Sequence, residues 1–250
     1  MAEFLGIIPA RYASTRFPGK PLAKLGDKPM VQWVYERASS VFEHLLVATD
    51  DQSIYDAVTG FGGKVQMTSP SHISGTDRCA EAAYLYERET GLRFSHVVNI
   101  QGDEPLIQPE QLQGLINCFE APGTGIATLI RILKDKNELP DPNAVKVVVD
   151  KSFRALYFSR SPIPFVRNSG TGKEAAKVTY YTHIGLYAFQ REVLDRVVKL
   201  APSSLEKAES LEQLRWLEHG ITIQTAVSDL PTLGVDTPDD LERIRKQLFS

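Results

Sequence analysis

The first half of the chain alternates short apolar runs with segments of helical periodicity. Four runs have the length and composition of buried strands: residues 4–8, 45–48, 64–68 and 97–100. Helices are predicted between and after them for residues 31–38, 52–58, 76–89 and 109–119, with Asp51 suited to cap the second of these helices. This alternation predicts a mostly parallel sheet covered by helices on both faces, with ligands bound at the carboxyl ends of the strands. The loops that follow residues 8 and 100 are therefore expected to face a ligand crevice.

The second half is richer in strand-like sequence. From residue 125 onward, loops that carry Pro and Gly separate the runs IATLIRIL, AVKVVVD, RALYFSR and YYTHIGLYAF. The longest loop, residues 161–174, is expected to act as a lid or as a subunit contact.

Helices return after residue 190. One predicted helix ends at Gly220 and has three leucines on one face: Leu211, Leu214 and Leu217. The last helix has a capping sequence, with Thr237 as N-cap, Pro238 at the first helical position and Asp240 placed for a capping box.

Composition narrows the class of protein. With 250 residues, 42% of them hydrophobic, the chain can bury the core of one large α/β domain or of a domain with a subdomain. A net charge of -3 argues against a nucleic-acid-binding protein, whose basic surface would raise the charge of the whole domain. Cys79 and Cys118 lack metal-ligand spacing, so buried thiols in a reducing compartment are expected. The absence of a signal-peptide pattern and of any run of about 18 apolar residues predicts a cytoplasmic protein without membrane insertion.

The loop after the first apolar run collects positive charge. Arg11, Arg16 and Lys20 occur within ten positions, with no carboxylate among them. Gly19 allows close approach of a ligand to the backbone. Any one of these cations alone is typical of a solvated surface, but three at the end of a strand favour a polyanion such as a triphosphate. The ATPase motif G-x-x-x-x-G-K-[ST] fails at Pro21, and no G-x-G-x-x-G occurs, which disfavours a P-loop or a dinucleotide fold.

Two aspartates are candidate ligands for a divalent metal. Polyphosphate sites usually need such an ion, and Mg²⁺ asks for one or two carboxylates together with phosphate oxygens and water. Asp103 follows a buried strand and a glycine, which puts its carboxylate at the edge of the sheet. Asp236 lies just outside the cap of the last helix. Taken alone, each aspartate is more typical of a turn, so the metal interpretation depends on the cationic loop.

These motifs resemble those of the 3-deoxy-manno-octulosonate cytidylyltransferase family. The matching stretches run along essentially the whole chain: IPARYASTRFPGKPL, VATDD, SGTDR, NIQGDEP, SRSPIP, HIGLYAF, LEQLRWLEHG and GVDTPDDLE. The opening motif, SGTDR and QGDEP are the most specific of them. Acylneuraminate cytidylyltransferases share the opening loop but are less similar over the second half. Phe17 stands where a leucine is expected in the family, a change that leaves the cations in place.

The resemblance implies an α/β, Rossmann-like three-layer nucleotidyltransferase fold. It has a mostly parallel sheet and a smaller β-rich subdomain used for dimerisation, so a homodimer is expected. A single domain would cover residues 1–250. Within it, residues 1–124 would form the nucleotide-binding half, residues 125–190 the sugar-binding and dimerisation portion, and residues 191–250 the closing helices with a metal aspartate.

The implied reaction joins CTP and 3-deoxy-D-manno-octulosonate (Kdo) to give CMP-Kdo and diphosphate, for lipopolysaccharide biosynthesis in the cytoplasm. The anomeric hydroxyl of the sugar attacks the α-phosphorus in line. Asp103 and Asp236 would hold Mg²⁺ and would form the catalytic set with Arg11 and Lys20. The CTP-binding residues implied by the resemblance are Ala10, Arg11, Ser14, Arg16, Lys20, Ser74, Arg78 and Gln101. Ser74 is also suited to cap the helix that follows it, and both roles can hold.

The sugar acid would need a cation and neutral hydrogen-bonding groups. The resemblance implies five residues for it: Arg160, His183, Tyr187, Glu212 and Gln213. Four of them also have simpler interpretations. Arg160 is compatible with a surface ion pair, His183 with a structural histidine and Tyr187 with the core. Gln213 stands in capping-box position after Ser210.

Two alternatives remain open at this stage. The first is a nucleotidyltransferase of the same fold that acts on another sugar acid, such as 8-amino-Kdo or an acylneuraminate, or on a sugar phosphate. The second is a non-catalytic nucleotide-binding module, which has little use for two separated aspartates beside a polyphosphate. The substrates of the released-diphosphate reaction distinguish these alternatives.

Overall fold

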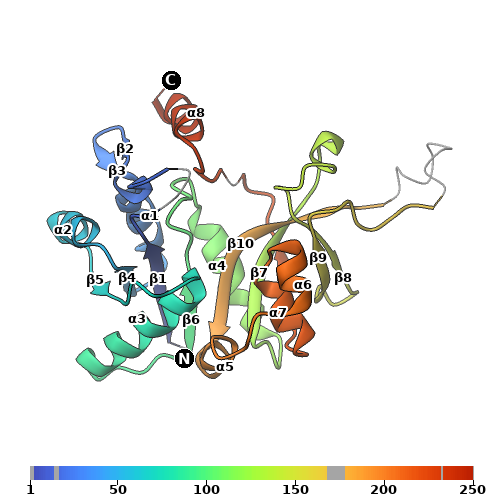
Figure 1. Cartoon of the computed structure of the whole chain (residues 1–250), viewed down its shortest axis with the longest axis horizontal. Helices are drawn as coiled ribbons and strands as arrows, with labels where there is room; N and C mark the ends of the chain where they lie inside the picture. The colour runs from blue at the N-terminus through green and yellow to red at the C-terminus, as the bar shows by residue number, and fades with distance from the viewer. Residues whose placement is uncertain (1–2, 14–16, 168–177, 232, 250) are drawn as a thin grey trace. The chain divides into compact units, whose positions relative to one another are not determined.

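The computed structural model describes residues 3–13, 17–167, 178–231 and 233–249 (Figure 1). The chain folds into two compact units, each built from separated segments. The first unit comprises Met1–Gln113, Leu186–Val198 and Pro231–Ser250, and the second comprises Gly114–Gly185 and Lys199–Leu230. The predicted division into residues 1–124, 125–190 and 191–250 assigns a function to each part of the chain, and it stays a prediction.

The first unit is built on a sheet with the strand order β10-β6-β1-β4-β5. Its strands are β1 (Phe4–Ala10), β4 (His44–Thr49), β5 (Val65–Met67), β6 (His96–Asn99) and the end of β10 (Tyr181–Gln190). β1 pairs in parallel with β4 and β6, and β4 pairs in parallel with β5. Only β10 runs antiparallel to its neighbour β6 among these described pairs. The four predicted strands of the first half are confirmed, and the sheet is mixed but mostly parallel, as expected.

Helices flank this sheet. They are α1 (Met30–Ala38), α2 (Gln52–Gly60), α3 (Gly75–Thr90), α4 (Pro109–Asn117), α5 (Arg191–Val197) and α8 (Pro238–Phe249). Short elements complete the unit: η1 (Lys20–Leu22), β2 (Lys24–Leu25) and β3 (Lys28–Pro29). The side chains of Leu5, Ile7 and Ile8 are fully buried, because a parallel strand between helical layers has no solvent face.

The helix starts follow the predicted capping chemistry. Asp51 accepts a hydrogen bond from the Ile54 backbone N–H at 3.1 Å at the start of α2. In α8, Asp240 N donates to Thr237 Oγ1 at 3.3 Å, and Thr237 N donates to Asp240 Oδ2 at 2.9 Å. This reciprocal pair satisfies backbone donors that the first turn of a helix leaves open, so the predicted capping box is confirmed.

The second unit contains the four strand-like runs predicted from its sequence. They form β7 (Ile126–Ile132), β8 (Lys146–Val149), β9 (Ala155–Ser159) and the beginning of β10. β8 pairs antiparallel with β9 and with β10. A further strand, β11 (Ile223–Val227), was not predicted and pairs in parallel with β7. The remaining elements are η2 (Cys118–Glu120), η3 (Lys136–Glu138), α6 (Ser204–Glu209) and α7 (Gln213–Glu218).

The predicted leucine helix of this unit is wrong in its extent and in its buried face. Leu211 precedes α7, and the helix buries Gln213, Leu214 and Trp216 rather than Leu217. The larger indole of Trp216 takes the buried position, since it removes more apolar surface from water. Ser210 closes α6 with a left-handed backbone at φ 52°, and no side chain caps α7, so Ser210 and Gln213 form no capping box.

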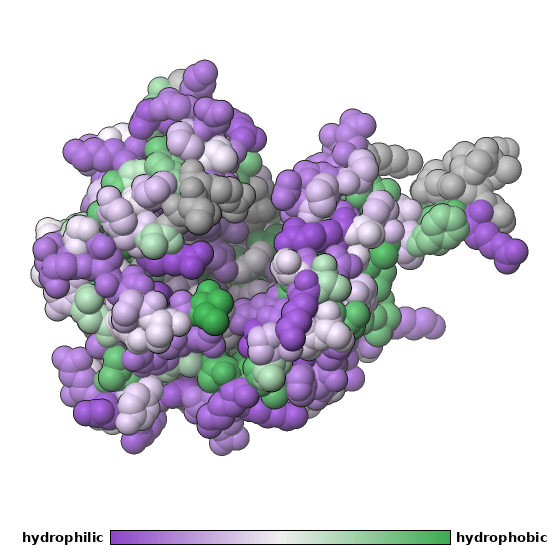
Figure 2. All heavy atoms as spheres, viewed as in Figure 1, coloured by the Kyte–Doolittle hydropathy of each residue, from purple (hydrophilic) through white to green (hydrophobic). Residues whose placement is uncertain are grey.

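The described surface gives no sign of a membrane-spanning segment. None of the helices in the part of the chain that the structure describes is long and apolar enough to cross a bilayer. The face drawn in Figure 2 is mostly hydrophilic, with apolar side chains scattered over it. Of the loop at residues 161–174, residues 168–174 lie outside the described residues, so its predicted role stays a prediction.

Candidate active site

A pocket of about 390 Å³ opens in the first unit at the carboxyl ends of β1 and β6. This is the edge of the sheet at which the strand pattern predicts a ligand. The pocket brings together eight of the residues predicted from the sequence: Ala10, Arg11, Lys20, Ser74, Arg78, Gln101, Asp103 and Asp236. The other two predicted nucleotide contacts, Ser14 and Arg16, lie outside the described residues.

The ammonium of Lys20 lies between the two candidate metal ligands. Lys20 Nζ is 2.6 Å from Asp103 Oδ2 and 3.6 Å from Asp236 Oδ1. It also donates a hydrogen bond to the Val235 carbonyl at 2.9 Å. Two aspartates that are more than a hundred residues apart in sequence therefore face one cationic position. A divalent ion with phosphate oxygens could take up the same two carboxylates.

Close backbone contacts hold these segments together. A Cβ atom on Gly102 would lie 2.9 Å from the Pro9 carbonyl oxygen, so only a glycine lets the loop after β6 approach the end of β1 so closely. Val235 N donates to the Asp103 carbonyl at 2.9 Å, which ties the segment before α8 to the same loop. The positions of both aspartates thus depend on backbone contacts as well as on side chains.

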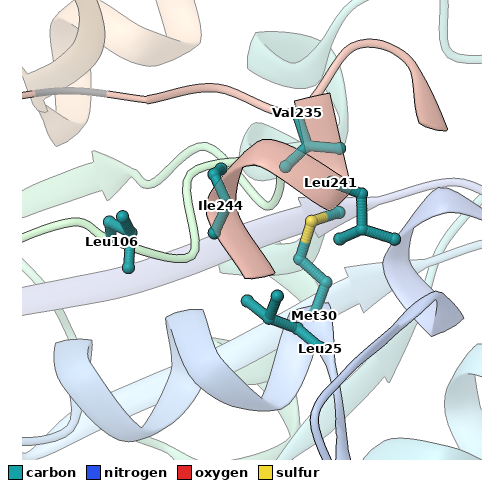
Figure 3. Close-up of a cluster of buried hydrophobic side chains, with 6 residues drawn as sticks. All are labelled: Leu25, Met30, Leu106, Val235, Leu241 and Ile244. Carbon is teal, nitrogen blue, oxygen red and sulfur yellow. The ribbon is translucent and has the colours of Figure 1, made fainter. Parts of the chain in front are cut away.

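A hydrophobic cluster lies beneath the same three segments (Figure 3). Its buried members come from the opening region, from the loop after β6 and from α8 with its approach: Leu25, Met30, Leu106, Val235, Leu241 and Ile244. Lys20 and Asp103 are each within five residues of one of these members, and Asp236 is next to Val235. Burial of each of these side chains stabilises the fold by about 1.5–3 kcal/mol. The packing of the cluster therefore fixes the positions of the charged groups nearby.

The cationic loop closes on itself through Gly19. This residue has a left-handed backbone at φ 68°, and its N–H donates to the Tyr12 carbonyl at 2.9 Å. A Cβ atom at Gly19 would lie 3.1 Å from the Tyr12 ring, which leaves little room for a side chain. The Lys20 side chain is only 15% exposed, whereas Arg11 is exposed at the pocket.

The other part of the pocket begins at the start of α3. Ser74 Oγ accepts from Asp77 N at 3.1 Å, so the predicted capping role of Ser74 is confirmed. Arg78 is almost fully buried, and its guanidinium donates to Thr68 Oγ1 at 2.6 Å and to Asp50 Oδ2 at 2.8 Å. Contacts of Ser74 and Arg78 with a nucleotide stay predictions, as does that of Gln101.

Glu104 was missed by the sequence reasoning. Burial raises the pKa of its carboxyl group to about 8, and the neighbouring Asp103 charge acts in the same direction. Its Oε2 is buried and has no hydrogen-bond partner among the described residues. The motif QGDEP places a second acid beside Asp103, but only the fold shows that a carboxylate oxygen of this acid is buried.

The residues predicted for the sugar acid divide between the units. Arg160, His183, Glu212 and Gln213 belong to the second unit, and the buried Tyr187 belongs to the first. Arg160 Nε donates to the Glu209 carbonyl at 2.7 Å, and Nη1 donates to the Pro142 carbonyl at 2.9 Å. These carbonyls hold the guanidinium in place within the second unit.

The other sugar-side residues of the second unit differ in how their polar atoms are used. His183 Nε2 is 2.9 Å from Thr128 Oγ1, and burial lowers the pKa of this histidine to about 3. Glu212 is half-buried at the start of α7. Gln213 is 5% exposed, and its Nε2 has no hydrogen-bond partner among the described residues. All five sugar assignments stay predictions.

The donor set suits a hard divalent cation shared with a substrate. Within the described ranges there is no group of three or more His, Cys, Asp or Glu side chains placed to hold a metal by themselves. Asp103 and Asp236 would supply the one or two carboxylates that Mg²⁺ usually takes when phosphates and water complete its shell. The position of the Lys20 ammonium between them shows that this place is electrostatically suited to a cation.

Known proteins of one family are similar to this chain in sequence and in fold. A sequence model described as cytidylyltransferase matches residues 5–223. A 3-deoxy-manno-octulosonate cytidylyltransferase of Phocaeicola vulgatus is 56% identical over 244 residues, which cover 96% of this chain and 95% of the relative. One of Bacteroides thetaiotaomicron is 54% identical over 249 residues and covers 98% of each chain.

A solved structure extends the similarity to the fold. It is a CMP:2-keto-3-deoxy-manno-octonic acid synthetase complexed with CTP, 43% identical, with a TM-score of 0.90 over 99% of this chain and 98% of the other. A cytidylyltransferase of Leptospira borgpetersenii is 16% identical with a TM-score of 0.63 and shares the fold alone. The chain therefore belongs to the cytidylyltransferase family, among the 3-deoxy-manno-octulosonate cytidylyltransferases.

Proposed function

We propose that this chain transfers CMP from CTP to the anomeric hydroxyl of Kdo and releases diphosphate. The observation that carries the proposal is the pair Asp103 and Asp236 around one cationic position, in a pocket that also contains Arg11 and Lys20. The curated relatives bear the name of this activity, and the similar solved structure is complexed with CTP. A module that only binds nucleotides would not need two separated carboxylates at this place.

The chain's own residues would bind, neutralise and orient the reactants. An O–P bond forms from the anomeric oxygen to the α-phosphorus while the bond to the bridging oxygen breaks, and the hydroxyl loses its proton to solvent. Arg11 and Lys20 would offset the charge of the triphosphate and of the departing diphosphate. Asp103 and Asp236 would hold Mg²⁺, whose chemistry when bound is to neutralise phosphate charge and to lower the pKa of a coordinated hydroxyl.

Lys20 would have a second task in this scheme. In the structure its ammonium neutralises the carboxylates that would hold the metal. With both carboxylates holding a metal, the Lys20 ammonium would be free to pair with phosphate oxygens of the triphosphate. Two adjacent carboxylates without any cation would repel each other, so Lys20 keeps the site assembled before substrates bind.

The sugar acid would be bound by residues of the second unit. Gln213 supports this assignment, because a buried amide donor without a partner costs free energy unless a ligand satisfies it. Arg160 is the cation of this group, although backbone carbonyls occupy its described hydrogen bonds. His183 and Glu212 would add neutral and acceptor groups for the hydroxyls of the sugar.

A homodimer in the cytoplasm belongs to the same proposal. Large apolar side chains of the second unit are open to solvent, among them Leu156 at 60% and Phe165 at 87% exposure. Exposed apolar groups of this size are typical of a surface that a partner covers. Light scattering would measure the mass of the particle. The product would serve lipopolysaccharide synthesis.

A released-diphosphate assay tests the proposal directly. Each of the four nucleoside triphosphates is combined with Kdo, 8-amino-Kdo, N-acetylneuraminate or a sugar 1-phosphate, with and without Mg²⁺. The expected result is turnover with CTP and Kdo that depends on the metal. A preference for 8-amino-Kdo or N-acetylneuraminate would reassign the sugar acid, turnover with a sugar 1-phosphate would reassign the reaction, and binding of CTP without any turnover would favour the non-catalytic alternative.

A further inference from the structure

The pocket has a part that lies apart from Lys20 and the two aspartates. His72 lines it on the loop that joins β5 to α3, and its Nε2 is 2.6 Å from Oε2 of Glu81 in α3. The neighbouring Ile73 lines the same pocket and is 91% exposed. An imidazole and an open apolar side chain thus stand together where a ligand would lie. His72 and Glu81 are not among the site residues predicted from the sequence.

Glu81 is built to hold the imidazole in one orientation. Its Oε2 also accepts a hydrogen bond from the Ser69 backbone N–H at 2.7 Å. Burial alone would raise the pKa of Glu81, but the hydrogen bonds from Ser69 and His72 and the nearby charges of His72 and Arg78 lower it. The carboxylate of Glu81 is therefore ionised at neutral pH and can only accept a hydrogen bond. Nε2 of His72 is then the donor in this contact.

This arrangement leaves the second ring nitrogen for a ligand. Nδ1 of His72 has no hydrogen-bond partner among the described residues, while Nε2 is committed to Glu81. The side chain is 19% exposed, so the ring is held by its surroundings but is still reachable from the pocket. A carboxylate that fixes the tautomer and the ring orientation of a histidine is a common way to prepare the other nitrogen for binding.

The charge balance around His72 indicates which part of a nucleotide it meets. His72 pairs with Glu81, and Arg78 pairs with Asp50. Asp77, on the same helix, is bonded to Ser74. His72 and Arg78 thus each have a carboxylate partner, so this part of the pocket offers little free positive charge to a phosphate. A neutral hydrogen-bonding group fits this part of the pocket better than a phosphate.

We infer that His72, oriented by Glu81, is a specificity-determining residue that hydrogen-bonds the nucleoside of the substrate, at a ribose hydroxyl or at the edge of the base. Ile73 would cover an apolar face of the same nucleoside. The inference rests on the proposed use of CTP and goes beyond it, because it assigns the recognition of the nucleoside to a histidine and carboxylate pair.

Binding of nucleotides without sugar tests this. Calorimetry compares CTP, 2′-deoxy-CTP, 3′-deoxy-CTP and UTP on the full chain and on His72→Ala, with Ser71→Ala as the matched control. Ser71 is exposed on the same loop and does not line the pocket. We expect His72→Ala to weaken CTP binding by about 3- to 10-fold, the usual range for one hydrogen bond. We also expect the parent's preference for CTP over one of the three analogues to shrink by the same factor.

The steady-state parameters and the second partner complete the test. KM for CTP should rise in His72→Ala with little change in kcat. Glu81→Ala should give part of that rise, and Glu81→Gln should bring KM most of the way back to the value of the parent. Equal loss toward CTP and all three analogues, or a loss below about twofold, would overturn the inference. If the parent chain itself fails to bind CTP, the proposed function fails instead, so the two failures are distinguishable.

Discussion

Lys20 in the first unit and Arg160 in the second unit are used in opposite ways. Around Lys20, three charged groups from distant segments meet in an open pocket and pair with one another, and Lys20 also donates to the Val235 carbonyl. Around Arg160, the donors are spent on backbone carbonyls within the unit. Charges that pair with one another in an open pocket can exchange those partners for an incoming ligand. A guanidinium bound by fixed carbonyls already has a structural task, and its binding role needs independent evidence.

The first prediction removes a carboxylate from the open cluster of charges formed by Lys20, Asp103 and Asp236. Asp103→Asn keeps the size of the side chain but removes half of the anionic charge that would hold the metal, so kcat/KM should fall by about 10²–10³-fold or more. The fold should persist, because Asn can still accept a hydrogen bond from Lys20. Diphosphate release against Mg²⁺ concentration measures the first effect, and circular dichroism checks the second.

Asp51→Asn is the matched control for that substitution. Asp51 caps α2 and does not line the pocket, and Asn is as good a cap as Asp. Activity should be unchanged in this variant. Full turnover of Asp103→Asn with an ordinary Mg²⁺ requirement would remove the metal assignment.

The second prediction disturbs the packing that supports Lys20, Asp103 and Asp236. Leu241 is 7% exposed in the hydrophobic cluster beside Val235, and Leu241→Ala should cost about 2–4 kcal/mol of unfolding free energy. Because the cluster also fixes the segment that carries Asp236, kcat/KM should fall as well, at temperatures where the variant remains folded. Urea unfolding and diphosphate release on the same samples measure both.

A second cavity elsewhere in the first unit provides the comparison for Leu241→Ala. Ile54 in α2 is fully buried but does not belong to the cluster, so Ile54→Ala should lower stability by a similar amount with little loss of activity. Equal losses of activity in the two variants would mean that Asp236 does not depend on the cluster.

Sequence patterns were sufficient where short-range physics decides. The alternation of strands and helices, the caps at Asp51 and Thr237, and the loops that carry Lys20 and Asp103 follow from local periodicity and turn chemistry. The short strand β11 was missed because its identity depends on pairing with β7, about a hundred residues earlier. Pairing between distant segments leaves little trace in a five-residue window.

The missed polar residues have the same physical origin. The raised pKa of Glu104 comes from burial that only the tertiary structure creates. The pairing of His72 with Glu81 joins a loop to the second turn of a helix, which no motif specifies. The contacts of Arg160 with carbonyls at positions 142 and 209 likewise arise from folding. Residue types thus predicted which groups line the pocket better than they predicted the burial and the partners of each group.

The third prediction tests whether a side chain of the second unit is available to bind the sugar acid. Gln213→Ala should raise KM for Kdo by about 3- to 10-fold and leave KM for CTP nearly unchanged, since its buried Nε2 would lose a bond to the sugar only. Gln224→Ala is the control, because that amide donates to the Ser152 carbonyl within the same unit. An equal rise in both KM values would count against a sugar-side position for Gln213.

The fourth and smallest effect concerns the buried histidine of the second unit. Burial holds the pKa of His183 near 3, below its ordinary value of 6.5, so the folded state keeps it neutral where the unfolded chain would bind a proton. Its contribution to stability is therefore complete above about pH 6.5 and is lost as the pH falls toward 3, by at most about 1.4 kcal/mol per pH unit. Urea unfolding at several pH values should show a shallower acid slope in His183→Gln than in the parent, while His219→Gln, at an exposed histidine, should follow the parent. An unchanged slope in His183→Gln would mean that this ring is hydrated, and its neighbourhood would then resemble the open cluster of the first unit.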